Sequence, residues 1–181
     1  VPQAAWQLVR VSELENHMEN TLDLLENRFR YPMFVKPAGT GSSVGVSKVG
    51  DRDALRSGLR YAGKYDKKIL VEEFINGKEI EVAVMGNDNP MASICGEIDS
   101  GAEFYDYDAK YISDCAHLYI PARISEQTAE QVREQAVRVY TAMGCRGLSR
   151  VDFFVTPDGG TVFNEINTIP GFTSISMYPK L

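Results

Sequence analysis

A predicted β-hairpin near the C-terminal end of the chain constrains its fold most strongly. Residues 148–167 contain two β-branched and aromatic runs on either side of a Pro-Asp-Gly turn, which is typical of a hairpin. Alternate residues of a strand lie on the same face. Arg150 and Asp152 therefore share one face of the first strand, and Glu165 and Asn167 share one face of the second. If the two faces coincide, two carboxylates and an amide oxygen converge beside a guanidinium. Hard oxygen ligands of this kind suit magnesium, and the alternative is two polar edges of a solvated hairpin.

A segment rich in glycine and serine, residues 38–45, is a second candidate site. Its small residues allow backbone N–H groups to approach a polyanion, and its serine hydroxyls add further donors. It is not a Walker A loop, because no Lys-Ser/Thr pair follows its glycines, and a predicted strand rather than a helix comes next. We expect a hairpin loop between two strands. Lys36, at the end of the first strand, favours phosphate binding over a simple turn.

The composition excludes several classes of protein. The chain has 181 residues, of which 44% are hydrophobic and 24% charged, as in a globular protein with one ordinary domain or two small ones. The net charge of −6 argues against nucleic acid or a membrane surface as a partner. Three widely spaced cysteines without a Cys-x-x-Cys pair argue against a disulfide scaffold or a zinc site. We therefore expect a reducing, cytoplasmic setting.

The remaining patterns predict runs of strands with a helix between pairs of them. Helices are expected at 12–26, 51–64 and 125–143, and further strands at 68–75, 79–85, 91–98 and 118–121. This order favours an α+β fold with two small lobes over a doubly wound parallel sheet. We expect the lobes to be residues 1–76 and 77–181, with a hinge at the Asn-Gly turn between them. Three tyrosines, two aspartates and a lysine in residues 103–111 indicate either a lid loop or an ordinary packed rim.

Taken together, these segments resemble the ATP-grasp ligases, and most closely the D-alanine–D-alanine ligase family. The motifs that carry the resemblance stand in the order of the family and span nearly the whole chain. They are Val35-Lys36-Pro37 with Gly41-Ser42-Ser43-Val44-Gly45, the tyrosine-rich segment 104–111, Arg150-Val151-Asp152, and the run 164–174 that begins Asn-Glu-Ile-Asn.

The resemblance implies an ATP-grasp fold, in which two α+β lobes with antiparallel sheets enclose the nucleotide. The implied ATP-binding residues are Lys36, Ser42, Ser43, Val44, Glu72, Phe74, Ile75, Glu79 and Lys110. The implied ligands of two Mg²⁺ (or Mn²⁺) ions are Asp152, Glu165 and Asn167, and the implied catalytic residues are Ser42, Lys110, Tyr111 and Arg150. The second amino acid is expected at Arg150, Ser174 and Ser176.

The activity that the resemblance implies is ATP-dependent joining of two D-alanines, through an acylphosphate, for peptidoglycan precursor synthesis. ATP and D-alanine are then the substrates, with no nucleic-acid or membrane partner, and a homodimer stays open. The alternatives are D-serine or D-lactate as acceptor, a non-catalytic nucleotide-binding module, and a small kinase. The family has an N-terminal domain that helps to bind the first D-alanine, and nothing here corresponds to it. The chain begins at Val1 without Met and ends abruptly, so we expect a fragment that cannot complete ligation alone.

Overall fold

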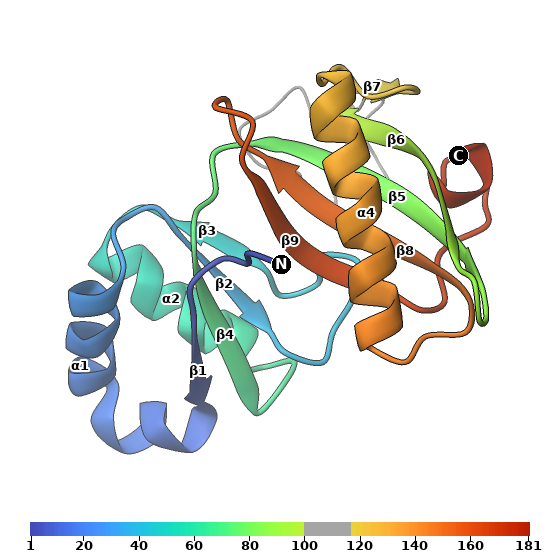
Figure 1. Cartoon of the computed structure of the whole chain (residues 1–181). Helices are drawn as coiled ribbons and strands as arrows, with labels where there is room; N and C mark the ends of the chain where they lie inside the picture. Colours follow the sequence, from blue (N-terminus) through green and yellow to red (C-terminus); the bar gives the residue numbers. More distant parts are fainter. Residues whose placement is uncertain (100–116) are drawn as a thin grey trace. The chain divides into compact units, whose positions relative to one another are not determined.

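The computed structural model describes residues 1–99 and 117–181, which form two compact units (Figure 1). The N-terminal unit consists of residues 4–74, and the C-terminal unit consists of residues 1–3, 75–99 and 117–181. Each unit has its own hydrophobic core. The architecture is α+β, as the sequence predicts.

The N-terminal unit is an antiparallel sheet with two helices. Its strands, in spatial order, are β1 (Trp6–Arg10), β4 (Lys68–Glu73), β2 (Met33–Pro37) and β3 (Ser47–Val49). Helices α1 (Val11–Arg28) and α2 (Arg52–Ala62) share the core with the sheet. Met33 and Val35 of β2 are fully buried in this core. The residues that alternate with them, Phe34 and Lys36, therefore lie on the opposite face of the sheet.

The beginning of α1 differs from the prediction. The sequence predicts a helix from Ser12, but the helix begins one residue earlier, at Val11, with Arg10 as its N-cap. The side chain of Glu13 accepts the Arg10 N–H at 3.1 Å. The N–H groups at the start of a helix lack intrahelical partners. Either the Glu13 carboxylate or the Ser12 hydroxyl can accept one of them, and in this helix the Glu13 carboxylate does so.

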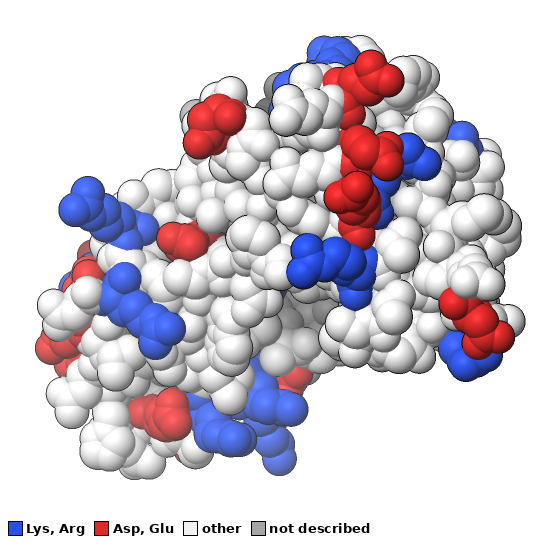
Figure 2. Space-filling model, viewed as in Figure 1, with Lys and Arg blue, Asp and Glu red and all other residues white. Residues whose placement is uncertain are grey.

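The C-terminal unit is a five-stranded antiparallel sheet covered on one face by a single helix. The strands, in spatial order, are β7 (His117–Tyr119), β6 (Met91–Asp99), β5 (Lys78–Gly86), β8 (Gly147–Val155) and β9 (Thr161–Asn167). Helix α4 (Glu126–Ala142) crosses this sheet (Figure 1) and begins at Ser125, whose hydroxyl accepts the Thr128 N–H. Figure 2 shows acidic side chains in a row along α4, where Glu126, Glu130 and Glu134 recur every four residues on the exposed side.

A β-bulge interrupts the pairing of β8 with β9. Asp152 pairs with Glu165, but the next residue, Phe153, pairs with Phe163, so Asn164 stands without a register partner on β8. The rings of Phe153 and Phe163 meet edge-to-face in the core, with centroids 5.9 Å apart. In a regular strand Phe163 and Glu165 would share a face. The bulge places the aromatic ring in the core and leaves Glu165 exposed on the other side of the sheet.

Two other features correct or extend the prediction. Residues 76 and 77 do not form a hairpin turn, because β4 and β5 belong to different sheets. The tail after Asn167 ends in the short 3₁₀-helix η1 (Tyr178–Lys180). Within the described residues, no helix has both the length and the hydropathy that crossing a membrane requires.

Candidate functional site

Four polar side chains gather on the face of the C-terminal sheet that lies opposite α4. Arg150 pairs in register with Asn167, and Asp152 pairs with Glu165. Their neighbours in sequence, such as Val151, are buried in the core with α4. The coincidence of the two strand faces expected from the hairpin is therefore present, and it depends on the bulge at Asn164.

Hydrogen bonds join these four side chains into one cluster. The Arg150 guanidinium donates through Nε to Asp152 Oδ1 at 2.8 Å and through Nη2 to Asp152 Oδ2 at 2.7 Å. The Asn167 amide nitrogen donates to Asp152 Oδ2 at 3.1 Å and to Glu165 Oε1 at 3.0 Å. Asp152 is only 8% exposed. Its charge is thus held by a bidentate arginine and an amide rather than by water.

A third carboxylate, Glu81 of β5, belongs to the same cluster, and sequence reasoning missed it. Glu81 Oε2 lies 3.2 Å from Arg150 Nε, whereas Glu165 Oε1 lies 3.9 Å from Arg150 Nη2. Burial alone would lower the pKa of Arg150, but the hydrogen-bonded Asp152 and the charges of Glu81 and Glu165 outweigh it and raise the pKa. The guanidinium is therefore a fixed positive charge. Glu81 alternates with buried Ile80 and Val82 in β5, but only the pairing of β5 with β8 identifies its neighbour.

The donor set of the cluster suits a divalent cation. Asp152, Glu165 and Asn167 offer carboxylate and amide oxygens, which are ligands for Mg²⁺ or Mn²⁺ rather than for softer metals. Within this cluster, three carboxylates around one guanidinium leave a formal net charge of about −2. In the part of the chain that the structure describes, no group of three His, Cys, Asp or Glu side chains is arranged to hold a metal. The candidate set thus consists of two carboxylates and the Asn167 amide, whose oxygen faces the carboxylates after rotation of the amide.

The N-terminal unit carries a second polar cluster, on the sheet face opposite its helices. Lys36 Nζ forms an ion pair with Glu72 Oε2 at 2.7 Å. Lys48, which the sequence analysis did not single out, lies over the Phe74 ring at 4.5 Å from the centroid. Two lysines and a carboxylate from three neighbouring strands, with an aromatic ring directly after β4, can bind a flat, anionic ligand. The signal for Lys48 was its alternation with buried Val49 in β3.

The glycine- and serine-rich segment joins β2 to β3 as a hairpin loop, as predicted. Ser42 and Ser43 have positive φ values of 53° and 59°, and Gly45 has φ of 79°. These conformations close two tight turns, in which the Val44 N–H donates to Gly41 O at 3.1 Å and the Val46 N–H donates to Ser43 O at 3.2 Å. A Cβ at Gly45 would lie 2.7 Å from side-chain atoms of both Pro37 and Tyr65. Glycine is therefore required there both for conformation and for space.

The other predicted site residues are dispersed. Glu79 of β5 pairs in register with Phe154, on the same sheet face as Glu81. Ser174 is exposed in the tail, whereas the Ser176 hydroxyl accepts the Thr173 N–H at 3.0 Å and closes a turn. Ile75 lies in the link that follows β4, and Val44 in the Gly/Ser loop. Lys110 and Tyr111 lie outside the described residues, so their predicted roles stay predictions.

Comparison with known proteins adds the family. A family model described as "D-ala D-ala ligase C-terminus" matches residues 1–181. The chain belongs to this family. A D-alanine–D-alanine ligase from Acetivibrio thermocellus is 54% identical over 182 residues, covering 100% of this chain and 48% of that protein. One from Ruminiclostridium cellulolyticum is 52% identical, covering 100% of this chain and 49% of its own length.

Two solved structures show the same similarity at the level of the fold. The VanG D-Ala:D-Ser ligase from Enterococcus faecalis has a TM-score of 0.86 and 40% identity, covering 99% of this chain and 51% of that one. The D-alanine–D-alanine ligase from Coxiella burnetii has a TM-score of 0.82 and 35% identity, covering 99% and 46%. This member of the D-Ala–D-Ala ligase C-terminal family thus spans about half the length of the relatives it matches.

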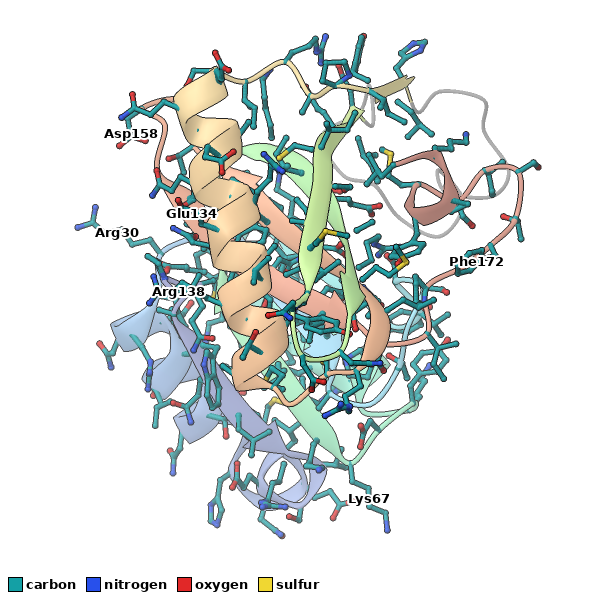
Figure 3. All side chains as sticks on the ribbon, turned by 45° about the vertical axis from the view of Figure 1, so that its right-hand side comes forward. Arg30, Lys67, Glu134, Arg138, Asp158 and Phe172 are labelled. Atoms are coloured by element: carbon teal, nitrogen blue, oxygen red, sulfur yellow. The ribbon has the colours of Figure 1, made fainter. Side chains whose placement is uncertain are left out.

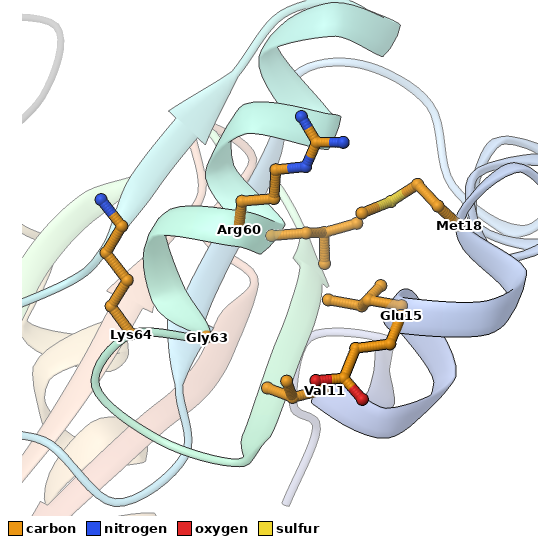
Figure 4. Close-up of a pocket in the computed structure, with 8 residues that line it drawn as sticks. Val11, Glu15, Met18, Arg60, Gly63 and Lys64 are labelled. Atoms are coloured by element: carbon orange, nitrogen blue, oxygen red, sulfur yellow. The ribbon is translucent and has the colours of Figure 1, made fainter.

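A pocket in the N-terminal unit of this family member lies away from both clusters. It has a volume of about 330 Å³ and lies between α1 and α2, where Met18, Glu15 and Arg60 are among the residues that line it (Figure 4). None of the predicted site residues lines it. The candidate site is therefore the polar sheet face, rather than this groove between helices.

Proposed function

We propose that this chain is the nucleotide- and metal-binding part of an ATP-dependent D-alanine–D-alanine ligase. The observation that carries the proposal is the cluster of Arg150, Asp152, Glu165 and Asn167 on β8 and β9, in a chain whose whole length matches the family. In this proposal, residues 1–76 and 77–181 are the two lobes of an ATP-grasp fold. The product, a D-alanine dipeptide, serves peptidoglycan synthesis in the cytoplasm.

Each cluster takes one part of the substrate in this proposal. Lys36 and the loop residues Ser42, Ser43 and Val44 bind the phosphates of ATP, because they combine a cation with serine hydroxyls and with small residues that let the backbone approach a polyanion. The resemblance assigns the adenine and ribose to Glu72, Phe74, Ile75 and Glu79. Glu72 already holds Lys36 at 2.7 Å, so its carboxylate orients the lysine that meets the phosphates.

Asp152, Glu165 and Asn167 are proposed to hold the metal ions. When bound, the ions offset the negative charge that gathers on the transferred phosphoryl group. Asn167 donates to both carboxylates, so without a cation it holds their oxygens close together, and its amide rotates to present an oxygen when a cation binds. This is the preorganisation that a closely spaced cation site requires.

Arg150 is proposed to stabilise the reacting carbonyl. The carboxylate of the first D-alanine attacks the γ-phosphorus of ATP, and ADP leaves. The amine of the second D-alanine then attacks the carbonyl carbon, phosphate leaves, and the amine loses a proton. Negative charge develops on the carbonyl oxygen during this second attack, and a half-buried guanidinium that keeps its charge lowers the barrier. Lys110 and Tyr111 are assigned to the transferred phosphoryl group and to exclusion of water by the resemblance alone.

The second amino acid is a separate question. Identities above 50% to D-alanine–D-alanine ligases support D-alanine. The similarity to the VanG D-Ala:D-Ser ligase supports D-serine as the alternative acceptor. The Thr173–Ser176 turn in the tail is the proposed site for its carboxylate. Competition between D-alanine and D-serine in the whole ligase, with the two dipeptides separated by mass spectrometry, decides between these acceptors.

Binding of Mg·ATP to the 181-residue chain tests the core of the proposal. Ligand at about 100 times its Kd stabilises a folded protein by about 2.7 kcal/mol, which thermal unfolding detects. We expect this stabilisation in the chain and in Glu134→Ala, where an exposed glutamate on α4 is lost, and its absence in Glu165→Ala. Equal stabilisation of Glu165→Ala would refute the metal site. We expect ATP- and D-alanine-dependent phosphate release to need the remainder of the ligase, and dipeptide synthesis by this chain alone would contradict that part.

A further inference from the structure

The Nε–H of Arg150 lies between two carboxylates from different strands. It donates to Asp152 Oδ1 at 2.8 Å, and Glu81 Oε2 lies 3.2 Å from the same nitrogen. Glu81 and Asp152 are register partners on β5 and β8, so their side chains are neighbours on one sheet face. Both carboxylates are therefore within hydrogen-bond distance of one donor, although only Asp152 accepts its hydrogen.

Glu81 is held in place by burial. It is 7% exposed, and the residue on its other side in the sheet, Gly96, has no side chain to compete for the space. A Cβ at Gly96 would lie 2.7 Å from the Met177 sulfur, so the tail packs closely over this position. The Glu81 carboxylate therefore has little freedom to leave Arg150.

The hydrogen bonds of Asp152 conflict with metal binding. Arg150 occupies both oxygens of Asp152, and Asn167 adds a third donor to Oδ2. A divalent cation approaches a carboxylate oxygen to about 2.1 Å and repels a guanidinium on the same group. For Asp152 to serve as a ligand, the guanidinium must find another acceptor without leaving the site.

We propose that Glu81 is a positioning residue, which takes the Nε–H of Arg150 when a divalent cation binds Asp152. Arg150 then keeps its place beside the metal instead of turning toward solvent. The inference rests on the proposed function. It adds Glu81 as a residue that holds Arg150 in place and does not itself contact a ligand. Glu81 acts through Arg150 and touches neither substrate nor metal.

Two substitutions separate positioning from charge. Glu81→Met removes both the charge and the acceptor, whereas Glu81→Gln removes the charge and keeps an amide oxygen that can accept the Nε–H. Loss of a residue that orients a metal site typically weakens metal binding by about 10- to 100-fold. We expect about this loss of Mn²⁺ affinity in Glu81→Met, and a clearly smaller loss in Glu81→Gln.

The assay is titration of the full chain with Mn²⁺, with the free ion measured by electron paramagnetic resonance. Glu134→Met and Glu134→Gln are matched controls, because Glu134 extends from α4 on the other side of the sheet (Figure 3). Both should bind Mn²⁺ as the unsubstituted chain does. Equal losses in Glu81→Gln and Glu81→Met would mean that only charge matters and would overturn the proposal, as would no loss in Glu81→Met.

A second measurement needs no substitution at Glu81 and so does not depend on the folding of a variant. The side-chain Nε–H of Arg150 gives a ¹H–¹⁵N signal in arginine-labelled chain, assigned by its absence in Arg150→Met. On addition of Mg²⁺ we expect the signal to shift and to remain protected from exchange with water. Loss of the signal into rapid exchange would overturn the proposal. Failure of the unsubstituted chain to bind Mn²⁺ at all would instead refute the proposed function, and the inference with it.

Discussion

Replacement of Arg150 by methionine should destabilise the C-terminal unit, even though it removes a polar group from a half-buried place. The guanidinium lies within 2.7 to 3.2 Å of Asp152 and Glu81, both of which are less than 10% exposed. Methionine fills a similar volume, but it leaves two neighbouring carboxylates without their shared cation. The free energy of unfolding should therefore fall.

The size of the loss follows from the geometry. Unit charges about 3 Å apart attract by about 5 kcal/mol at an effective dielectric constant of about 20. Part of this is offset in the variant, because the desolvation cost of the guanidinium is no longer incurred. Removing one partner of a buried ion pair costs about 3 to 5 kcal/mol in measured cases. We expect the same range here, which is a large fraction of the roughly 5 to 15 kcal/mol that stabilises a typical domain.

Hydrogen exchange of the β8 amides measures this loss in the affected unit, with β2 of the N-terminal unit as an internal reference. Because the penalty comes from ionised carboxylates, it should be full at neutral pH and diminish as acid protonates them, or as Mg²⁺ binds. Arg138→Met, at an exposed position of α4 (Figure 3), should change stability by less than about 0.5 kcal/mol. A loss below about 1 kcal/mol, or one that does not vary with pH, would refute the reasoning, since buried unpaired carboxylates must show both.

Two further predictions concern other parts of the fold. Burial raises the pKa of Glu97, but hydrogen bonds from Arg123 outweigh it and hold the pKa below its usual range. The ionised Glu97 carboxylate therefore stabilises the fold fully above the unfolded pKa of about 4.3. This stabilisation is lost as the pH falls through the lower pKa of the folded state. Glu97→Gln should lower the free energy of unfolding by about 1 kcal/mol at pH 7, since Arg123 is half exposed, and should not change it in strong acid. Urea unfolding at both pH values measures the difference. A difference that does not vary with pH would contradict the prediction. Gly45→Ala should lower the free energy of unfolding by about 1 to 3 kcal/mol, because its φ is +79° and a Cβ would clash with Tyr65. Gly41→Ala, with open space around it, should lower it far less in the same assay. Equal losses in the two variants would show that the loop relaxes freely.

Local patterns predicted the part of the site that lies within one hairpin. The turn at residues 156–160 and the alternation of polar with apolar residues were enough to place Arg150 with Asp152 and Glu165 with Asn167. Both depend on interactions within about twenty residues of sequence. The same holds for the Ser125 cap of α4 and for the loop between β2 and β3.

Non-local pairing accounts for what the sequence did not reveal. Glu81 is about seventy positions from Arg150, and only the adjacency of β5 and β8 brings them together. The same is true of Lys48 over Phe74, which requires the order of strands in the N-terminal sheet. The Arg10 cap of α1 was missed for another reason, because the segment offers both Ser12 and Glu13 as capping side chains and the sequence does not rank them.

The bulge in β9 also determines which changes in chain length the hairpin can accept. Deleting Asn164 would leave Phe163 opposite Phe153 and Glu165 opposite Asp152, since Asn164 has no register partner of its own. Deleting Val162 or Ile166 would instead turn one half of the strand over and direct an aromatic ring to solvent or an amide into the core. Related chains that differ by one residue here should therefore carry the gap at position 164, with the aromatic ring and the carboxylate unchanged on either side.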